Sequence, residues 1–440
     1  MSSLDPLPKS TEDIRRLLSH YRSHVLLYSI LAVAAFNRAH LTPADRASFR
    51  QQGDKYSEMA NSMLKRILDQ GDESGQLLYD KVEKQALMAA ALTLTTVEVF
   101  SGGSKGIGYE HLRMCRRVIR ATGGLRWWIS DATSTTLLQI YRCLRIVAST
   151  SGWADSNEAR DGQAVLEAAT DNSPQDSELD DSMYETPLSR GDERIVEPRP
   201  TMPIGDYTLD ITFGISVKTL GFLNETIELS RIKGRMGHDN TWASDAASRL
   251  IRLEQGLFDA LDDFETLKDH VNAHLRPHDA IPSYVAEVIK DNHISAFHYS
   301  TIVFFRRALC NGSTDFVPRV EGHEARKRPT GQHLVSKALE HLENIDSLSH
   351  NISVADTLWP GFVAAVEAVD TDLRHRALVW LARAKRHGIG NVFQAVSLVM
   401  EVWRRVDRQW VEKTRGLESE LGSVDWRQVM QEQGTYIMLT

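Results

Sequence analysis

The strongest constraint on the fold of this chain is the spacing of its apolar residues, which recur every three or four positions. Between Ile14 and Tyr28, apolar side chains occupy positions 14, 17, 18, 21, 25 and 28. This spacing places them on one face of a helix. No convincing run of alternating apolar residues, the pattern of a half-buried strand, occurs along the chain. The sequence therefore predicts an all-α fold.

The same spacing predicts helices over most of the chain, with glycines and prolines marking their ends. Thr42 and Pro43 resemble an N-cap followed by a proline at the first helical position, which predicts a helix start there. After the first helical face, the expected segments are 42–71, 77–100, 109–122, 133–150, 216–232, 245–273, 281–309, 331–347, 360–368, 373–385 and 392–410.

The helical pattern stops between residues 151 and 203, where Asp, Glu, Ser, Pro and Gly dominate. Such a segment buries too little apolar surface to offset its ordering entropy, so we expect a disordered acidic linker. Its few apolar residues among acids, such as Leu179 and Tyr184, leave an acidic activation segment as an alternative. The chain then divides into an N-terminal helical half (1–150), the linker (151–203) and a C-terminal half of the same domain (204–440).

The charge of the chain is concentrated in this linker. Residues 155–197 hold thirteen acidic residues against three arginines, a net of −10, whereas the whole chain carries −8. The remainder is therefore near neutral, at about +2, and we expect no basic patch and no direct binding of nucleic acid.

The cysteines and the hydropathy exclude several classes of protein. Cys115, Cys143 and Cys310 stand far apart without CxxC spacing, so we expect no disulfide framework, no thiolate zinc site and a reducing compartment. The longest apolar run, Val25–Phe36, has twelve residues, short of the roughly 20 that a membrane helix needs. Residues 1–11 are polar, unlike a signal peptide. We expect no membrane insertion.

Two histidine pairs lie close enough along the chain to be considered as metal ligands. His20 and His24 share a helix face, but Tyr21 stands where the zincin motif needs a glutamate. His293 and His298 are five residues apart and point to different faces. Neither pair has a third ligand, so the sequence predicts no metal site.

A glycine-rich segment, Ser101–Gly108, is similar to the cofactor turn of short-chain dehydrogenases and also spells Gly-x-Ser-x-Gly. Both motifs require a preceding strand of a sheet, and a helical pattern precedes this one. The Tyr-x-x-x-Lys pair of those dehydrogenases is absent from the chain. We therefore interpret the segment as a loop between helices and predict no cofactor and no catalytic residues.

The C-terminal third contains an ordered series of short motifs. They are a Trp-Pro start with a Glu-Ala step (358–368), a Gly-x-x-Asn-like turn (387–392), a Val-Trp near a helix end (399–405) and a terminal Asp-Trp segment (424–430). This series resembles the fungal-specific transcription factor regulatory domain, the helical region that follows a binuclear zinc cluster in many fungal regulators. Segments 30–36, 111–124 and 210–216 agree with the same family, so the resemblance covers nearly the whole chain.

The resemblance implies a multi-helix array that regulates transcription in the nucleus, for instance of a metabolic gene cluster. Expected partners are the transcription machinery or a partner regulator, a small hydrophobic ligand, and a second copy in a homodimer. A zinc cluster needs six cysteines, and this chain has three. The sequence leaves open whether a cluster precedes Met1 in the natural protein.

We expect a ligand to bind where aromatic residues concentrate, on the segments 281–309 and 359–368. The candidate ligand-binding residues are Phe297, Phe304, Trp359 and Phe362, with Tyr299 and Phe305 beside them. Aromatic residues at helical spacing are more often core than ligand wall. The alternative function is an enzyme of secondary metabolism that holds a hydrophobic substrate in such a pocket.

Overall fold

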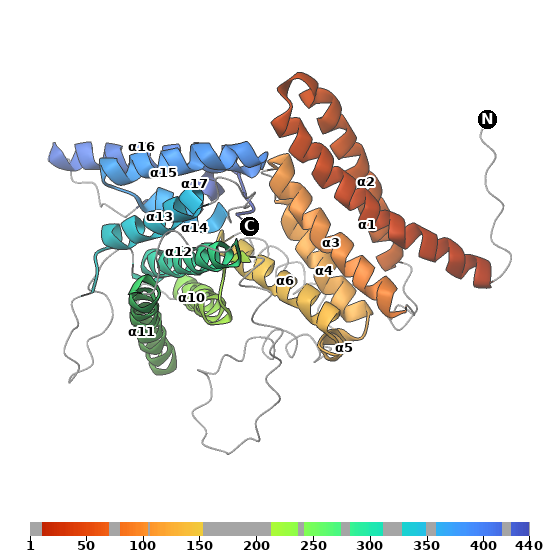
Figure 1. Ribbon diagram of the computed structural model, residues 1–440, viewed down its shortest axis with the longest axis horizontal. Helices are drawn as coiled ribbons and strands as arrows, with labels where there is room; N and C mark the ends of the chain where they lie inside the picture. Colours follow the sequence, from red (N-terminus) through yellow and green to blue (C-terminus); the bar gives the residue numbers. More distant parts are fainter. Residues whose placement is uncertain are drawn as a thin grey trace, which may run out of the picture. The chain divides into compact units, whose positions relative to one another are not determined.

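The computed structural model describes residues 11–69, 80–103, 106–152, 213–235, 242–273, 282–310, 328–348, 358–415 and 424–439. Within these ranges every regular element is a helix and none is a β-strand, which confirms the predicted all-α fold (Figure 1). The predicted linker, 151–203, lies almost entirely outside the described residues, and the division into three parts stays a prediction. The helices group into two compact units, described in turn below.

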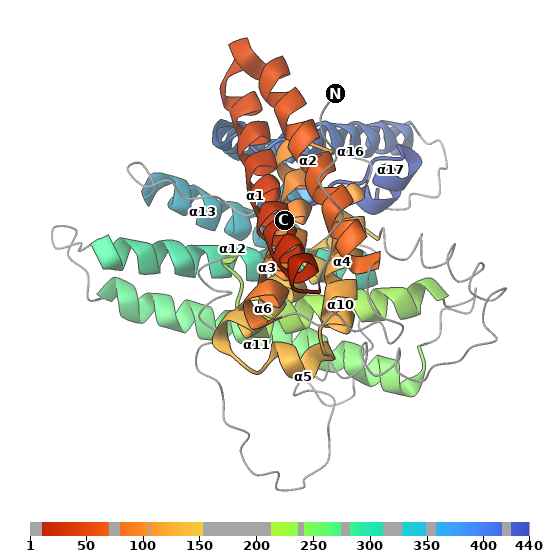
Figure 2. The same ribbon diagram turned by 90° about the vertical axis from the view of Figure 1, so that its right-hand side faces the viewer.

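The first unit comprises Met1–Arg142 with Lys385–Asn391. Here α1 packs on α2 and α3, and α3 packs on α4. In both views α1 and α2 run side by side as a hairpin (Figures 1 and 2). Its elements are α1 (Thr11–Leu41), η1 (Pro43–Asp45), α2 (Arg46–Asp69), α3 (Lys81–Ser101), α4 (Ile107–Ala121), α5 (Gly124–Trp128), most of α6 (Ala132–Ser149) and η2 (Lys385–His387).

Helix α1 is unusually apolar. Its span His24–Leu41 is long and apolar enough to cross a membrane by length and composition, a property that core helices of soluble proteins share. Val25, Ala32 and Phe36 on this span are buried. Gly53 of α2 lets the Phe36 ring approach closely, since a Cβ at Gly53 would lie 2.9 Å from it. Packing on α2 and α3 buries about a third of this span (33%), while Leu27, Ile30 and Leu41 on it are each about half exposed.

The glycine-rich segment connects α3 to α4, as expected of a loop between helices. Gly102 has φ 72° and ends α3 in the left-handed conformation that favours glycine. The turn before α16 packs on this loop, because a Cβ at Gly390 would lie 2.4 Å from the backbone nitrogen of Gly102. The backbone of the family-like turn thus contacts the backbone of the glycine loop. This contact leaves no room for a side chain at Gly102 or Gly390, which accounts for both glycines.

The second unit comprises Cys143–Ala384 with Val392–Thr440. Helix α12 is central to it and packs on α10, α11, α13 and α14, while α14 also packs on α13 and α15. Its helices are α10 (Val217–Arg235), α11 (Ser244–Ala273), α12 (Pro282–Cys310), α13 (Gly331–Leu348), α14 (Leu358–Glu367), α15 (Thr371–Ala384), α16 (Asn391–Thr414) and α17 (Trp426–Glu432).

Gly361 of α14 leaves room for the Trp380 ring of α15. A Cβ at Gly361 would lie 2.1 Å from an atom of the Trp380 ring, and Trp380 is buried. We expect Gly361→Ala to lower the free energy of unfolding by about 1–3 kcal/mol, the usual cost of overpacking a core. Gly234, inside α10, has nothing within 4 Å of its missing Cβ. Gly234→Ala should raise stability by about 0.5 kcal/mol. Urea unfolding of both variants tests this, and equal effects would contradict it.

Candidate functional site

Helix α14 is the most deeply buried helix end to end, since all residues from Leu358 to Val366 are buried. The first four N–H and last four C=O groups of a helix have no partner within it. Burial removes water as an alternative partner, so neighbouring side chains must supply these hydrogen bonds. In the first turn, the Ser300 hydroxyl of α12 donates to the Pro360 carbonyl at 3.0 Å, a bond that ties α12 to α14 but does not cap a terminal group.

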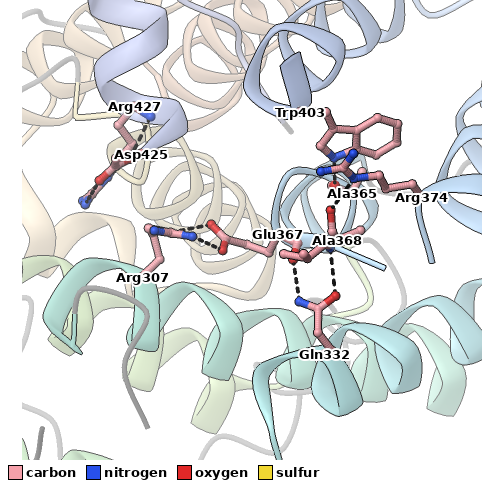
Figure 3. A network of polar contacts seen from close by, with 10 residues as sticks. Arg307, Gln332, Ala365, Glu367, Ala368, Arg374, Trp403, Asp425 and Arg427 are labelled. Carbon is pink, nitrogen blue, oxygen red and sulfur yellow. Dashed lines mark hydrogen bonds and ion pairs between the residues drawn. The ribbon is translucent and has the colours of Figure 1, made fainter. Parts of the chain in front are cut away.

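The C-terminal end of α14 is closed by the side-chain amide of Gln332 on α13 (Figure 3). Its nitrogen donates to the Glu367 carbonyl oxygen at 2.9 Å. Its oxygen accepts the backbone N–H groups of Val369 and Asp370 at 2.8 and 3.3 Å. One side-chain amide therefore provides hydrogen-bond partners for the last helical carbonyl and for the two N–H groups of the chain that leaves the helix.

Two further helices reach the same end of α14. The indole Nε1 of Trp403, on α16, donates to the Ala365 carbonyl at 2.9 Å. Nε of Arg374, on α15, donates to the Ala368 carbonyl at 3.1 Å. The Arg374 guanidinium also lies over the Trp403 ring, 5.2 Å from its centroid, and pairs with Asp407. The family-like Val-Trp motif thus closes a helix end (Figure 3).

The acidic residue of the Glu-Ala step forms an ion pair that is largely shielded from solvent. Glu367 binds Arg307 of α12 through two hydrogen bonds, and both side chains are only 13% exposed. Burial raises the pKa of Glu367, and the charge of Arg307 offsets part of this rise. The pair therefore ties α12 to α14 at the cost of desolvating two charges.

The terminal Asp-Trp segment begins α17 with an N-cap. One carboxylate oxygen of Asp425 accepts the backbone N–H of Arg427 at 2.9 Å, and the Arg427 guanidinium binds the same carboxylate. Burial alone would raise the pKa of Asp425, but Arg427 brings it below its usual value. The Arg427 guanidinium also lies 5.7 Å from the centroid of the Phe304 ring. The motif therefore holds the end of the chain on α12.

The four candidate ligand-binding residues lie together in one aromatic cluster. Phe297 stacks on Trp359 at 4.8 Å between ring centroids, and Phe304 meets Trp359 edge-on at 6.0 Å. Phe362 meets Trp426 edge-on at 5.1 Å. All five rings are at most 1% exposed. Trp426 is the member of this cluster that was not predicted from the sequence.

The contacts of the cluster are those of a packed core. The Trp359 indole donates to the Thr150 hydroxyl at 2.9 Å, which satisfies its one polar group. Of the two neighbouring candidates, Tyr299 stacks on His341 and Phe305 is buried. Their role in ligand binding stays a prediction. Among the described residues, no group of three His, Cys, Asp or Glu side chains could hold a metal ion.

His293 and His298, the second histidine pair, are buried in this unit. In His298, Nε2 lies 2.9 Å from the Leu257 carbonyl oxygen and Nδ1 lies 3.2 Å from the Thr219 hydroxyl. Burial lowers the pKa of His293 and of His298 to about 4. Both rings therefore fold in their neutral form.

These histidines predict a loss of stability in acid. An unfolded histidine has a pKa of about 6.5, so between pH 6.5 and 4 the unfolded chain takes up protons that the folded chain refuses. For His298 the loss should reach at most about 3 kcal/mol. The raised pKa of Glu367 has the opposite effect, because it makes the folded chain more stable as the pH falls. The contribution of His298 is therefore measured by comparing variants with the wild type. In urea unfolding at pH 7 and pH 5, His298→Gln should lose less stability than wild type on acidification, and exposed His375→Gln as much as wild type. Equal losses in all three proteins would refute the assignment.

The Arg307–Glu367 pair predicts a non-additive response to mutation. Arg307→Met should lower the free energy of unfolding by about 3–5 kcal/mol, because it leaves a buried carboxyl without its partner. The double variant Arg307→Met with Glu367→Leu removes both charges and should be more stable than the single variant. Urea unfolding measures both. A double variant that is no more stable than Arg307→Met would contradict the coupling.

Comparisons with known proteins agree with these motifs. The family model described as the fungal specific transcription factor domain matches residues 3–440. Arginine metabolism regulation protein II of Saccharomyces cerevisiae is 23% identical over 116 residues, which cover 26% of this chain and 12% of that protein. The chain thus matches about one eighth of the length of this relative. No solved structure matches the chain. Because the family model spans the sequence, the chain belongs to the fungal-specific transcription factor domain family, and its role is in the regulation of transcription.

Proposed function

We propose that this chain is the regulatory, protein-interaction part of a fungal transcription regulator and acts in the nucleus without contacting DNA itself. The observation that carries this proposal is the family match over residues 3–440. The residues typical of the family, such as Trp359, Glu367 and Trp403, close and pack helices in the interior. An architecture of this kind leaves the surface to partners.

The charge of the chain supports the second half of the proposal. A net charge of −8 opposes approach to the phosphate backbone. A binuclear zinc cluster needs six cysteines, and the chain's three are all buried. The name of the relative refers to the regulation of arginine metabolism. This supports metabolic genes as the targets, and a transcription-regulator family favours a regulator over the alternative enzyme.

A tethering experiment tests the proposal. We expect the chain, fused to an unrelated DNA-binding domain, to change transcription of a reporter gene relative to that domain alone. The purified chain should not retard a random DNA duplex in a gel-shift assay at low salt, where non-specific binding is strongest. A fusion without effect on the reporter would contradict the regulatory role. Tight, salt-dependent retardation of the duplex would contradict the absence of DNA contact.

A further inference from the structure

Helix α4 has two faces of opposite character. One face is buried and includes Leu112, Cys115, Val118 and Ile119. The other face, which we call the α4 arginine face, carries four arginines. They are Arg113 and the residues three, four and seven positions after it: Arg116, Arg117 and Arg120. This spacing puts all four on one side of the helix, over about 10 Å of its length.

The arginine face is strongly basic for an acidic chain. From Ile107 to Trp128 there are five arginines against the single acid Glu110, a net of +4. The side chains of Arg113 and Arg117 are 45% and 50% exposed, and Arg120 is exposed. The expectation that the chain has no basic patch was therefore wrong. The summed charge of the folded part is near neutral because acidic residues on other helices cancel the arginines of this face.

Helix α2 borders the arginine face. The Asn61 amide oxygen lies 2.9 Å from Nε2 of the buried His111, which fixes α2 beside α4. Exposed carboxylates already bind two of the arginines, since Asp69 pairs with Arg117 at 2.8 Å and Glu110 with Arg113 at 3.3 Å. Such exposed ion pairs are weak and exchange readily for other partners.

We propose that the α4 arginine face binds an acidic segment of a partner protein, most simply a helix with carboxylates at the same spacing. The guanidinium fork matches a carboxylate in a bidentate geometry. Asp69 and Glu110 show that carboxylates fit among these arginines. Ile129, directly after the neighbouring helix α5, is 54% exposed and is an apolar residue that a partner can contact. This proposal rests on the proposed function and names the chemistry of the partner.

Duplex DNA fits the same face less well. Its phosphates would approach Asp69 and Glu110 as well as the arginines, and like charges in contact oppose binding. The net charge of −8 also repels a long polyanion more than a short acidic segment.

The test measures binding of a labelled synthetic peptide of about twenty residues, with glutamates spaced by three and four and leucines between them. Fluorescence anisotropy at low salt gives its Kd. The variant R113Q/R117Q/R120Q should raise Kd at least about tenfold, and salt should weaken the wild-type complex. The control K55Q/R235Q/R408Q removes three exposed cations elsewhere and should leave Kd within about twofold. Circular dichroism should show both variants equally folded.

Three results of the binding measurement would overturn the proposal. They are a peptide that does not bind at low salt, an equal loss of affinity in the control variant, and a random duplex that binds this face more tightly than the peptide. The reporter fusion separates this proposal from the proposed function. If R113Q/R117Q/R120Q regulates the reporter like wild type, the arginine face is not the interaction surface, although the chain is regulatory. If the fusion is inactive but the peptide still binds, the regulatory role fails alone.

Discussion

The hydrogen-bond requirement of the buried helix α14 is the constraint on which the second unit depends. A helix placed wholly in the core cannot leave its terminal carbonyls to water. Its C-terminal carbonyls are met by Gln332, Trp403 and Arg374, which come from three different helices. Each donor must therefore stand at one position along its own helix. One ten-residue helix in this way sets the register of α13, α15 and α16.

Electrostatics add a second restriction to the same region. Arg307 with Glu367 and Asp425 with Arg427 hold charge in or near the core, where each charge needs a partner close by. Buried pairs of this kind restrict the arrangement of helices more than they add to stability. Residues 437–439 are buried as well, so the last residues of the chain belong to the core of this unit. The family-like Asp-Trp segment begins this last buried stretch, since Trp426, Val429 and Met430 are also buried.

The sequence predicted the long helices well, because three turns or more of apolar periodicity identify a buried face. Helices α5 and α17 have five and seven residues, too few to show a period, and the sequence analysis missed both. Capping was harder still. Thr42 makes no side-chain cap and is followed by a 3-10 turn, whereas Asp80 and Glu83 form an unpredicted capping box that starts α3 at Lys81, four residues later than expected.

Contacts between distant residues limited the prediction of the site. The sequence gathered four aromatic residues into one cluster, because they lie on two helices with strong periodicity. It did not add Trp426 or pair Gln332 with Glu367, since nothing local signals a contact across 35 residues or more. The α4 arginine face was hidden for another reason. Its four arginines are visible in the sequence, but only the packing of Cys115 and Val118 turns them all outward.

Interior and surface carry different information in this chain. The motifs that identify the family lie inside, where Trp359, Trp403 and Asp425 satisfy hydrogen bonds and close helix ends. A change at such positions disturbs the whole array, so these residues report on the fold and indicate little about any one partner. Partner choice must come from exposed residues that no packing requirement fixes. The arginines of α4 meet that condition, since Arg113 and Arg117 leave about half of their side-chain surface in water.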